Sequence, residues 1–145
     1  MWRIRKLVPG DVSGVLLLQS SCAEIAQWTA ADYEQVAGGH MAGWVAEDDD
    51  GIVGFLIART LGRETEILNI AVRPDARRRG VGSNLLSQAV VWSTGLRAER
   101  VLLEVRESNS SAIGFYERHG FRVAGRRRGY YATPAEDALL LDLQL

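Results

Sequence analysis

The sequence of 145 residues has little cysteine and histidine and almost no net charge. Its single cysteine, Cys22, excludes an internal disulfide and any metal cage built from several thiolates. No apolar run reaches the ~18 residues that a membrane span needs, and the N-terminus lacks a secretory apolar segment. A formal net charge of -1 produces no overall electrostatic attraction to nucleic acid or to a membrane. We therefore expect a cytoplasmic protein that binds neither.

Other scarce residues also exclude kinds of site. The two histidines, His40 and His119, have no metal-ligand spacing, so we expect surface or capping roles for them and no metal. Residues 48–50 are three aspartates, but they lack the ligand spacing of a calcium loop and indicate a plain turn before Gly51. No His or Asn lies at a spacing from Cys22 that indicates a catalytic nucleophile, so we expect an inert thiol.

The near-zero net charge conceals an uneven distribution along the chain. Residues 1–72 hold five Lys and Arg against ten Asp and Glu, whereas residues 73–145 hold twelve against eight. The basic half is therefore the place to look for an anionic ligand. The alternative is a solvated surface on which charge happens to be segregated.

The composition, 47% hydrophobic and 24% charged, predicts one globular domain over residues 1–145. Apolar patterns and turn residues predict seven strands, at Trp2–Val8, Met41–Glu47, Ile52–Thr60, Glu64–Val72, Arg100–Arg106, Phe121–Ala132 and Ala138–Leu145. Apolar residues at helical spacing predict four helices, one after Asp11, one from Thr29 to about Ala37, and two at Gly80–Thr94 and Asn109–His119. This order predicts an α+β or α/β fold, a mixed sheet with helices on its faces.

Several short signals fix the ends of these elements. Asp11 and Thr29 are expected N-caps of the first two helices, and Gly38-Gly39 ends the second. Asp50-Gly51 between two apolar runs predicts a hairpin. Gly120 follows the last helix at the position where glycine commonly ends one.

The most informative segment lies between a buried strand and an amphipathic helix. Gly80 and Gly82 let the backbone approach a ligand without a Cβ in the way. The free N–H groups of the first helical turn and the helix dipole both favour an anion there. The residues that we assign to this phosphate-binding turn are Arg77, Arg78, Arg79, Gly80, Val81, Gly82 and Ser83.

Two familiar nucleotide motifs are excluded at this turn. It contains no Gly-Lys-Ser/Thr, so it is not a P-loop. Its glycine spacing does not match the dinucleotide fingerprint, and no parallel βαβ series continues from it. The turn therefore indicates a pyrophosphate site of another kind, and the alternative is a tight turn with exposed arginines.

The spacing Arg77-x-x-Gly80-x-Gly82 resembles the acyl-CoA pyrophosphate motif of the GNAT superfamily of N-acetyltransferases. The segments that extend the resemblance are Asn69–Val72, Leu103–Asn109, Ala112–Glu117, Gly120–Phe121 and Arg127–Tyr131. Together they resemble the bacterial ribosomal-protein-alanine N-acetyltransferase branch, in detailed motif over residues 69–131. The resemblance implies the GNAT fold, with a mostly antiparallel sheet of about seven strands and four helices. It also implies acetyl-CoA as co-substrate.

Acetyl transfer to an amine needs one group to accept a proton and another to donate one. From the pattern alone, Glu104 is a strand glutamate on the face of Leu102 and Arg106, and Tyr116 is a core aromatic of the last helix. The resemblance implies that Glu104 is the general base, acting through water, and that Tyr116 is the general acid at the CoA sulfur. A phenol with a pKa of about 10 is protonated at neutral pH and can supply that proton.

The resemblance also assigns backbone and cap positions. It implies that the strand Ile70-Ala71-Val72 splays from the Glu104 strand and offers free N–H groups to the acyl oxygen, as in an oxyanion hole. It implies that Asn109 contacts CoA. An ordinary N-cap is the alternative reading of Asn109.

The acceptor side is less constrained by sequence. The tract Arg126–Tyr131 suits a half-exposed strand, and on its own it resembles a short single-stranded nucleic-acid site. The family resemblance implies instead that Tyr130 and Tyr131 frame the acceptor cleft, with Trp28. The branch often carries Phe-Pro-Trp-Ser where this chain has Glu24–Thr29, so the proline is missing here.

The sequence therefore predicts an acetyl-CoA-dependent N-acetyltransferase acting on a protein N-terminus, such as the alanine of a small-subunit ribosomal protein. The alternatives are a small-molecule amine or a lysine as acceptor, and a non-catalytic acyl-CoA-binding module. We expect acetyl-CoA and an acceptor protein or peptide as partners, and a monomer or weak homodimer.

Overall fold

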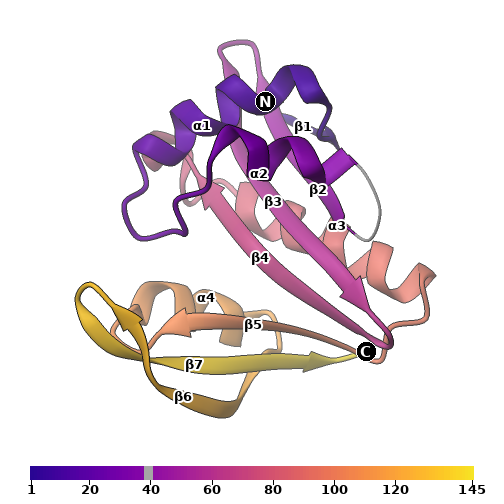
Figure 1. Ribbon diagram of the computed structural model, residues 1–145. Helices are drawn as coiled ribbons and strands as arrows, with labels where there is room; N and C mark the ends of the chain where they lie inside the picture. Colours follow the sequence, from indigo (N-terminus) through magenta and orange to yellow (C-terminus); the bar gives the residue numbers. More distant parts are fainter. Residues whose placement is uncertain (38–40) are drawn as a thin grey trace.

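The computed structural model describes residues 1–37 and 41–145, which form one seven-stranded sheet with helices on both faces (Figure 1). The strands are β1 Arg3–Lys6, β2 Met41–Asp48, β3 Gly51–Leu61, β4 Glu64–Val72, β5 Arg100–Arg106, β6 Arg122–Ala132 and β7 Ala135–Gln144. Their order across the sheet is β1-β2-β3-β4-β5-β7-β6, and every neighbouring pair is antiparallel except β4 and β5. The predicted Gly38-Gly39 break and the role of His40 lie outside the described residues.

Within residues 1–37 and 41–145, four α-helices and three 3₁₀ turns connect the strands. The α-helices are α1 Val12–Ser20, α2 Ala30–Glu34, α3 Val81–Gly95 and α4 Ser110–Arg118, and the 3₁₀ turns are η1 Pro9–Asp11, η2 Gln35–Ala37 and η3 Pro74–Ala76. Within the described parts of the chain, no helix is both long and apolar enough to cross a membrane.

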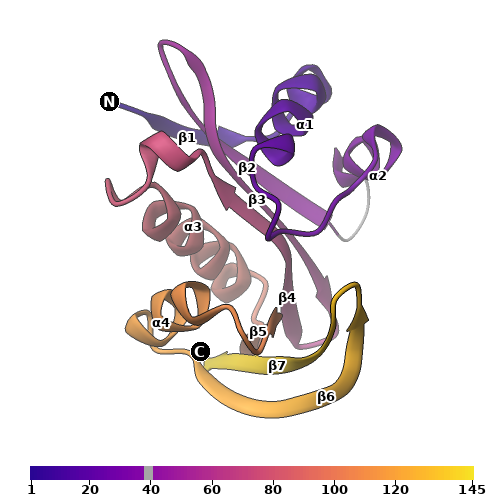
Figure 2. The ribbon, with the colours of Figure 1, turned by 90° about the vertical axis from the view of Figure 1, so that its left-hand side faces the viewer.

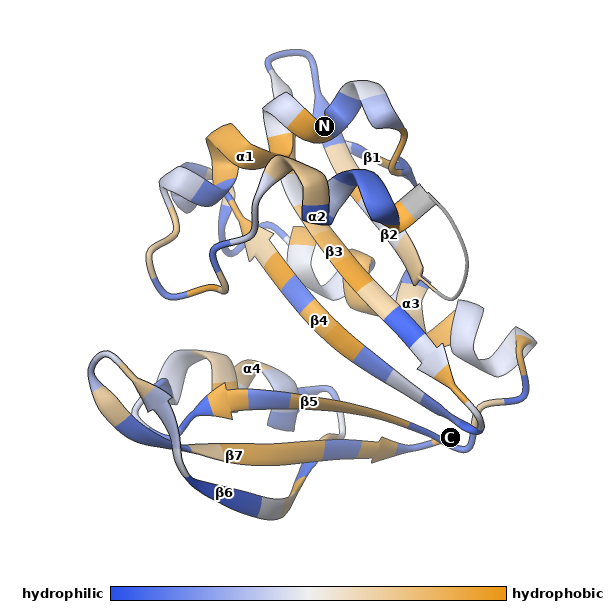
Figure 3. Cartoon of the chain, viewed as in Figure 1, coloured by the Kyte–Doolittle hydropathy of each residue, from blue (hydrophilic) through white to orange (hydrophobic). Residues whose placement is uncertain are grey.

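The helices divide between the two faces of the sheet, with α1 and α2 on one and α3 and α4 on the other (Figure 2). Side chains of β3 alternate between two cores: Phe55 packs with α1 and α2, whereas Leu56 packs with α3. This central strand is apolar along most of its length, whereas the edge strand β6 is strongly hydrophilic (Figure 3). The burial of β3 on both faces explains its continuous apolar run.

The predicted fold class is confirmed, and β4 and β5 have the predicted bounds. Thr29 caps α2 as predicted, because its hydroxyl accepts from the Asp32 N–H. Asp11 lies before α1, but its carboxylate does not cap that helix. It accepts instead from the Val8 N–H at 2.8 Å and pairs with Arg5 at 2.8 Å. These partners, Arg5 first, lower the pKa of Asp11.

Candidate active site between β4 and β5

The two parallel strands at the centre of the sheet stay paired over only a short stretch. β4 and β5 pair from Glu64 to Glu66, and the described strands then diverge (Figure 1). A shift of register against β3 leaves Leu68 without a partner, which is a β-bulge in β4. Because β4 and β5 are paired only as far as Glu66, no described strand on the β5 side accepts the N–H groups of the rest of β4. Ile70, Ala71 and Val72, the predicted oxyanion strand, lie in this unpaired part.

The phosphate-binding turn leads into the N-terminus of α3. Gly80 precedes the helix in the left-handed region at φ +90°, a conformation that costs glycine nothing. The first helical bond runs from the Asn84 N–H to the Gly80 carbonyl at 3.0 Å, and no side chain caps this end. The N–H groups of Val81, Gly82 and Ser83 therefore lack intrahelical acceptors. Such a helix end fits a pyrophosphate.

The Arg77 side chain has protein partners that the sequence did not indicate. Its Nε donates to the Val72 carbonyl at 3.1 Å, and its Nη2 pairs with Glu24 at 2.7 Å and lies 3.6 Å from the Cys22 Sγ. Cys22 is fully buried, as an inert thiol would be. Arg77 thus joins the phosphate-binding turn to the loop between α1 and α2.

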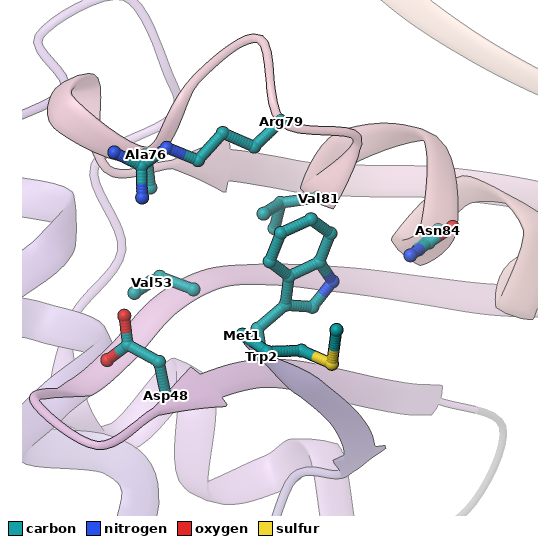
Figure 4. A pocket seen from close by; sticks show the side chains of 8 residues that line it. All are labelled: Met1, Trp2, Asp48, Val53, Ala76, Arg79, Val81 and Asn84. Carbon is teal, nitrogen blue, oxygen red and sulfur yellow. The ribbon is translucent and has the colours of Figure 1, made fainter.

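Arg79 lines a pocket of about 470 Å³ with Trp2, Asp48, Asn84 and others (Figure 4). None of the residues that line this pocket belongs to β5 or α4. The pocket therefore lies beside β1 and α3, apart from the opening between β4 and β5. A cofactor role for the side chains of Arg77, Arg78 and Arg79 stays a prediction.

Helix α4 brings Tyr116 to the α3 face of the sheet. The ring is 5% exposed and packs edge-on against Phe115 and Phe121, with centroids 5.2 and 5.5 Å away. No described residue hydrogen-bonds its hydroxyl, and burial raises the pKa of that group well above its usual value. Tyr116 therefore keeps its proton at neutral pH. Asn109 forms the N-cap of α4, because its Oδ1 accepts from the Ala112 N–H at 3.2 Å.

Helices α3 and α4 touch at the phosphate-binding turn. A Cβ on Gly82 would lie 3.3 Å from the Phe115 Cζ, so this glycine makes room for α4. The Ser83 hydroxyl lies 3.0 Å from the Nε2 of His119, the C-cap of α4. The sequence did not indicate either contact.

Glu104 lies on the other face of the sheet from Tyr116. Val101, Leu103 and Val105 of β5 are buried in the core with Tyr116, so strand alternation puts Glu104 on the opposite side. Its side chain is only 12% exposed. One carboxylate oxygen pairs with the Arg127 Nε at 3.3 Å, and the buried Oε2 has no hydrogen-bond partner.

The hairpin of β6 and β7 carries the predicted acceptor tyrosines. The rings of Tyr130 and Tyr131 meet edge-on at 5.0 Å. The Glu104 charge, above all, raises the pKa of Tyr130. The Arg106 guanidinium stacks 4.1 Å from the Tyr131 ring and donates to the Thr133 carbonyl at 3.0 Å. Arg106 therefore fixes this hairpin to β5.

A buried polar network holds the α1–α2 loop against β4. Asn69 of β4 donates to the Ala26 carbonyl at 3.0 Å and to the Tyr33 hydroxyl at 3.2 Å. Tyr33 donates in turn to the side chain of Gln19, which also bonds the backbone N–H and carbonyl of Trp28. The Trp28 ring packs on Tyr33 at 5.2 Å. Apolar patterning gave no signal for Gln19 or Asn69, because a buried amide shows itself only through partners distant in sequence.

Comparisons with known proteins agree with this geometry. Residues 16–121 match the model of the Acetyltransferase (GNAT) family. The [ribosomal protein bS18]-alanine N-acetyltransferase of Salmonella typhimurium is 39% identical over 99 residues, 67% of each chain. The Escherichia coli K12 protein with the same name is 32% identical over 120 residues, 81% of each chain.

A solved structure extends the likeness to the whole fold. The ribosomal-protein-S18-alanine N-acetyltransferase from Escherichia coli superposes with a TM-score of 0.88 at 28% identity, covering 99% of this chain and 94% of that one. The resemblance predicted from sequence is confirmed. This chain belongs to the GNAT family of acetyl-CoA-dependent acetyltransferases.

Proposed function

We propose that this enzyme acetylates the α-amine at a protein N-terminus, and that the N-terminal alanine of a small-subunit ribosomal protein is its acceptor. The names of the Salmonella and Escherichia relatives support this acceptor class. The observation that carries the mechanism is the placement of Glu104 and Tyr116 on opposite faces of one sheet, beside strands that diverge. In this proposal residues 1–145 act as one cytoplasmic domain, a monomer or weak homodimer.

The face with α3 and α4 is the donor side in this proposal. The free N–H groups at Val81, Gly82 and Ser83 hold the pyrophosphate of acetyl-CoA, which supplies an activated acetyl thioester. Unpaired N–H groups of β4 at residues 70–72 receive the thioester oxygen as negative charge develops on it. Asn109 lies at the start of α4 on the same side and contributes a further contact to CoA.

The face with α1 and α2 is the acceptor side. Trp28, Tyr130 and Tyr131 frame the approach of the peptide. The Oε2 of Glu104 accepts a proton from the acceptor ammonium through water, and the neutral amine then attacks the acetyl carbon. A nitrogen–carbon bond forms, the carbon–sulfur bond breaks, and the Tyr116 hydroxyl gives its proton to the departing sulfur. The attacking nitrogen loses its second proton to solvent, and exchange with solvent returns a proton to Tyr116 and removes the one held by Glu104.

The chemistry of Glu104 suits an α-amine better than a lysine. An α-amine has a pKa of about 8 and a lysine about 10.4, so roughly a tenth of α-amines are already neutral at pH 7. Fewer than about one lysine in a thousand is neutral at that pH. A carboxylate that acts through water is therefore an adequate base for an N-terminus.

A panel of acceptors tests the proposal. The enzyme is mixed with acetyl-CoA and a peptide that begins with alanine, and released thiol is followed. The matched control is the same peptide with a blocked N-terminus and an internal lysine, beside a set of small amines. We expect turnover of the free-N-terminus peptide alone. Preference for the blocked peptide or a small amine would contradict the acceptor, and CoA binding without turnover would contradict catalysis.

A further inference from the structure

Glu104 is held by one cation among the described residues. Arg127 Nε lies 3.3 Å from one carboxylate oxygen, and the other oxygen is buried without a partner. The Glu104 side chain is 12% exposed, whereas that of Arg127 is 62% exposed. A neighbouring cation or hydrogen-bond donor stabilises a carboxylate that is largely removed from water. Arg127 supplies that stabilisation from the solvent side.

The sheet register explains how an arginine two strands away reaches β5. Arg127 of β6 pairs with Ala138 of β7, and Ala138 pairs with Arg106 of β5. The side chain between them is only a methyl group, so Arg127 passes over it toward Glu104. A shift of register then separates Arg127 from Tyr131. This irregularity lets the strand present both Arg127 and Tyr130 near the carboxylate, with the guanidinium 5.6 Å from the Tyr130 ring.

We propose that Arg127 is a positioning residue for the acetyl transfer: its ion pair occupies one oxygen of Glu104, holds the carboxylate in place and leaves the other oxygen for the acceptor's proton. This inference rests on the proposed role of Glu104 as base. Arg127 touches neither donor nor acceptor in this arrangement, so it acts only through Glu104.

The groups around Glu104 set the expected direction of the pH effect. Arg127 of β6 and Arg106 of β5 are cationic, Tyr130 and Tyr131 of β6 are neutral phenols, and Glu66 of β4 is anionic. The β7 residue opposite Glu104 is the uncharged Leu140. Removal of the Arg127 charge therefore makes the carboxylate easier to protonate. The acid limb of the pH profile should move to higher pH.

The test is the pH profile of kcat/KM with an alanine-initiated peptide for Arg127→Gln. We expect the acid limb to move to higher pH by about one unit. This is at the low end of the shift that a nearby charge causes, because Arg127 is exposed. At a pH on the acid limb, turnover should fall up to about tenfold, since fewer enzyme molecules hold an ionised base, and well above the limb it should change little. Arg127→Lys keeps a charge and should keep the wild-type limb. Affinity for acetyl-CoA should not change.

Controls separate this inference from the function on which it rests. Arg122→Gln removes an exposed arginine from the same strand and should leave the profile unchanged. Arg127→Thr is a second neutral variant with strand propensity, in case the glutamine variant folds poorly. Suppose that Glu104→Gln lacks the acid limb, but the limb stays in place in folded Arg127→Gln and Arg127→Thr. That result would overturn the role of Arg127 alone. Glu104→Gln with a wild-type limb and rate would overturn the base itself, and the inference with it.

Discussion

The two faces of the sheet meet the opening between β4 and β5 with different chemical groups. The face with α3 and α4 offers backbone N–H groups and apolar rings, and its polar side-chain contacts described above are Ser83 with His119 and the Asn109 cap of α4. The face with α1 and α2 offers carboxylates, guanidinium groups and buried amides. In the proposed function the α3–α4 face holds acetyl-CoA, whose pyrophosphate and thioester are always the same, so backbone groups are enough to bind it. The α1–α2 face has to select an acceptor, and that selection requires side chains.

The two faces also differ in which groups come from neighbouring positions of the chain. On the α3–α4 face the proposed phosphate site consists of backbone groups at residues 80–83, which follow one another in sequence, although Ser83 also meets the distant His119. The acceptor side depends on Arg77 with Glu24, Asn69 with Tyr33, and Arg127 with Glu104, in which the closest pair is 23 positions apart. Substitutions on the two faces should therefore change different kinetic constants.

The largest effect is expected from Tyr116→Phe. The ring stays in its apolar site, and no described group loses a hydrogen bond. Loss of the acid should lower kcat about 10³-fold with acetyl-CoA affinity unchanged. Because burial raises the pKa of Tyr116, the wild-type enzyme should show no loss of this proton at mildly basic pH. Steady-state kinetics and calorimetry check this, and an unchanged kcat would remove Tyr116 as the acid.

A smaller and pH-dependent effect is expected from Glu104→Gln. At pH 7 kcat/KM should fall about 10²-fold, because most acceptor amines are charged. The deficit should shrink above about pH 8, where the α-amine loses its proton without help. Glu107→Gln, which alters an exposed glutamate just after the same strand, is the matched control. A deficit that does not change with pH would argue against a role in proton removal.

Gly82→Val addresses the donor face. The new side chain would crowd both the pyrophosphate site and Phe115, whose Cζ is 3.3 Å from a Cβ at this position. We expect the KM for acetyl-CoA to rise about tenfold, which corresponds to ~1.4 kcal/mol. The peptide KM should change little. Gly95→Val at the other end of α3 meets open space and serves as the control. Unaltered CoA binding in folded Gly82→Val would refute the proposed cradle.

The smallest effect is expected from Arg77→Ala. Its guanidinium bonds the α1–α2 loop, so the peptide KM should rise about threefold, as suits a half-exposed ion pair. Glu24→Gln should give a similar rise, and the double variant should add little. If Arg77 binds pyrophosphate instead, the KM for acetyl-CoA will rise and Glu24→Gln will not reproduce it.

Local sequence was sufficient for the turn before α3 and for most of the fold. Asp50-Gly51 predicted the β2–β3 hairpin, Thr29 the cap of α2, and the glycines of residues 80–82 the turn before α3. The same reasoning placed Asp11 correctly at the start of α1 but was wrong about its carboxylate, which is taken up by Arg5 and the Val8 N–H instead of the helix end. The roles of Glu104, Tyr116 and the other assigned site residues stay predictions.

Periodicity and turn residues were enough to place the strands, helices and turns, because they depend on neighbours along the chain. They also placed a helix N-terminus with free N–H groups after Gly80. Three facts required the folded structure: Glu104 and Tyr116 lie on opposite faces, a bulge at Leu68 accompanies the divergence of β4 from β5, and Arg127, paired in register with Ala138, reaches Glu104. Those facts depend on strand order and register, and a register slip of one residue would reverse every side chain involved.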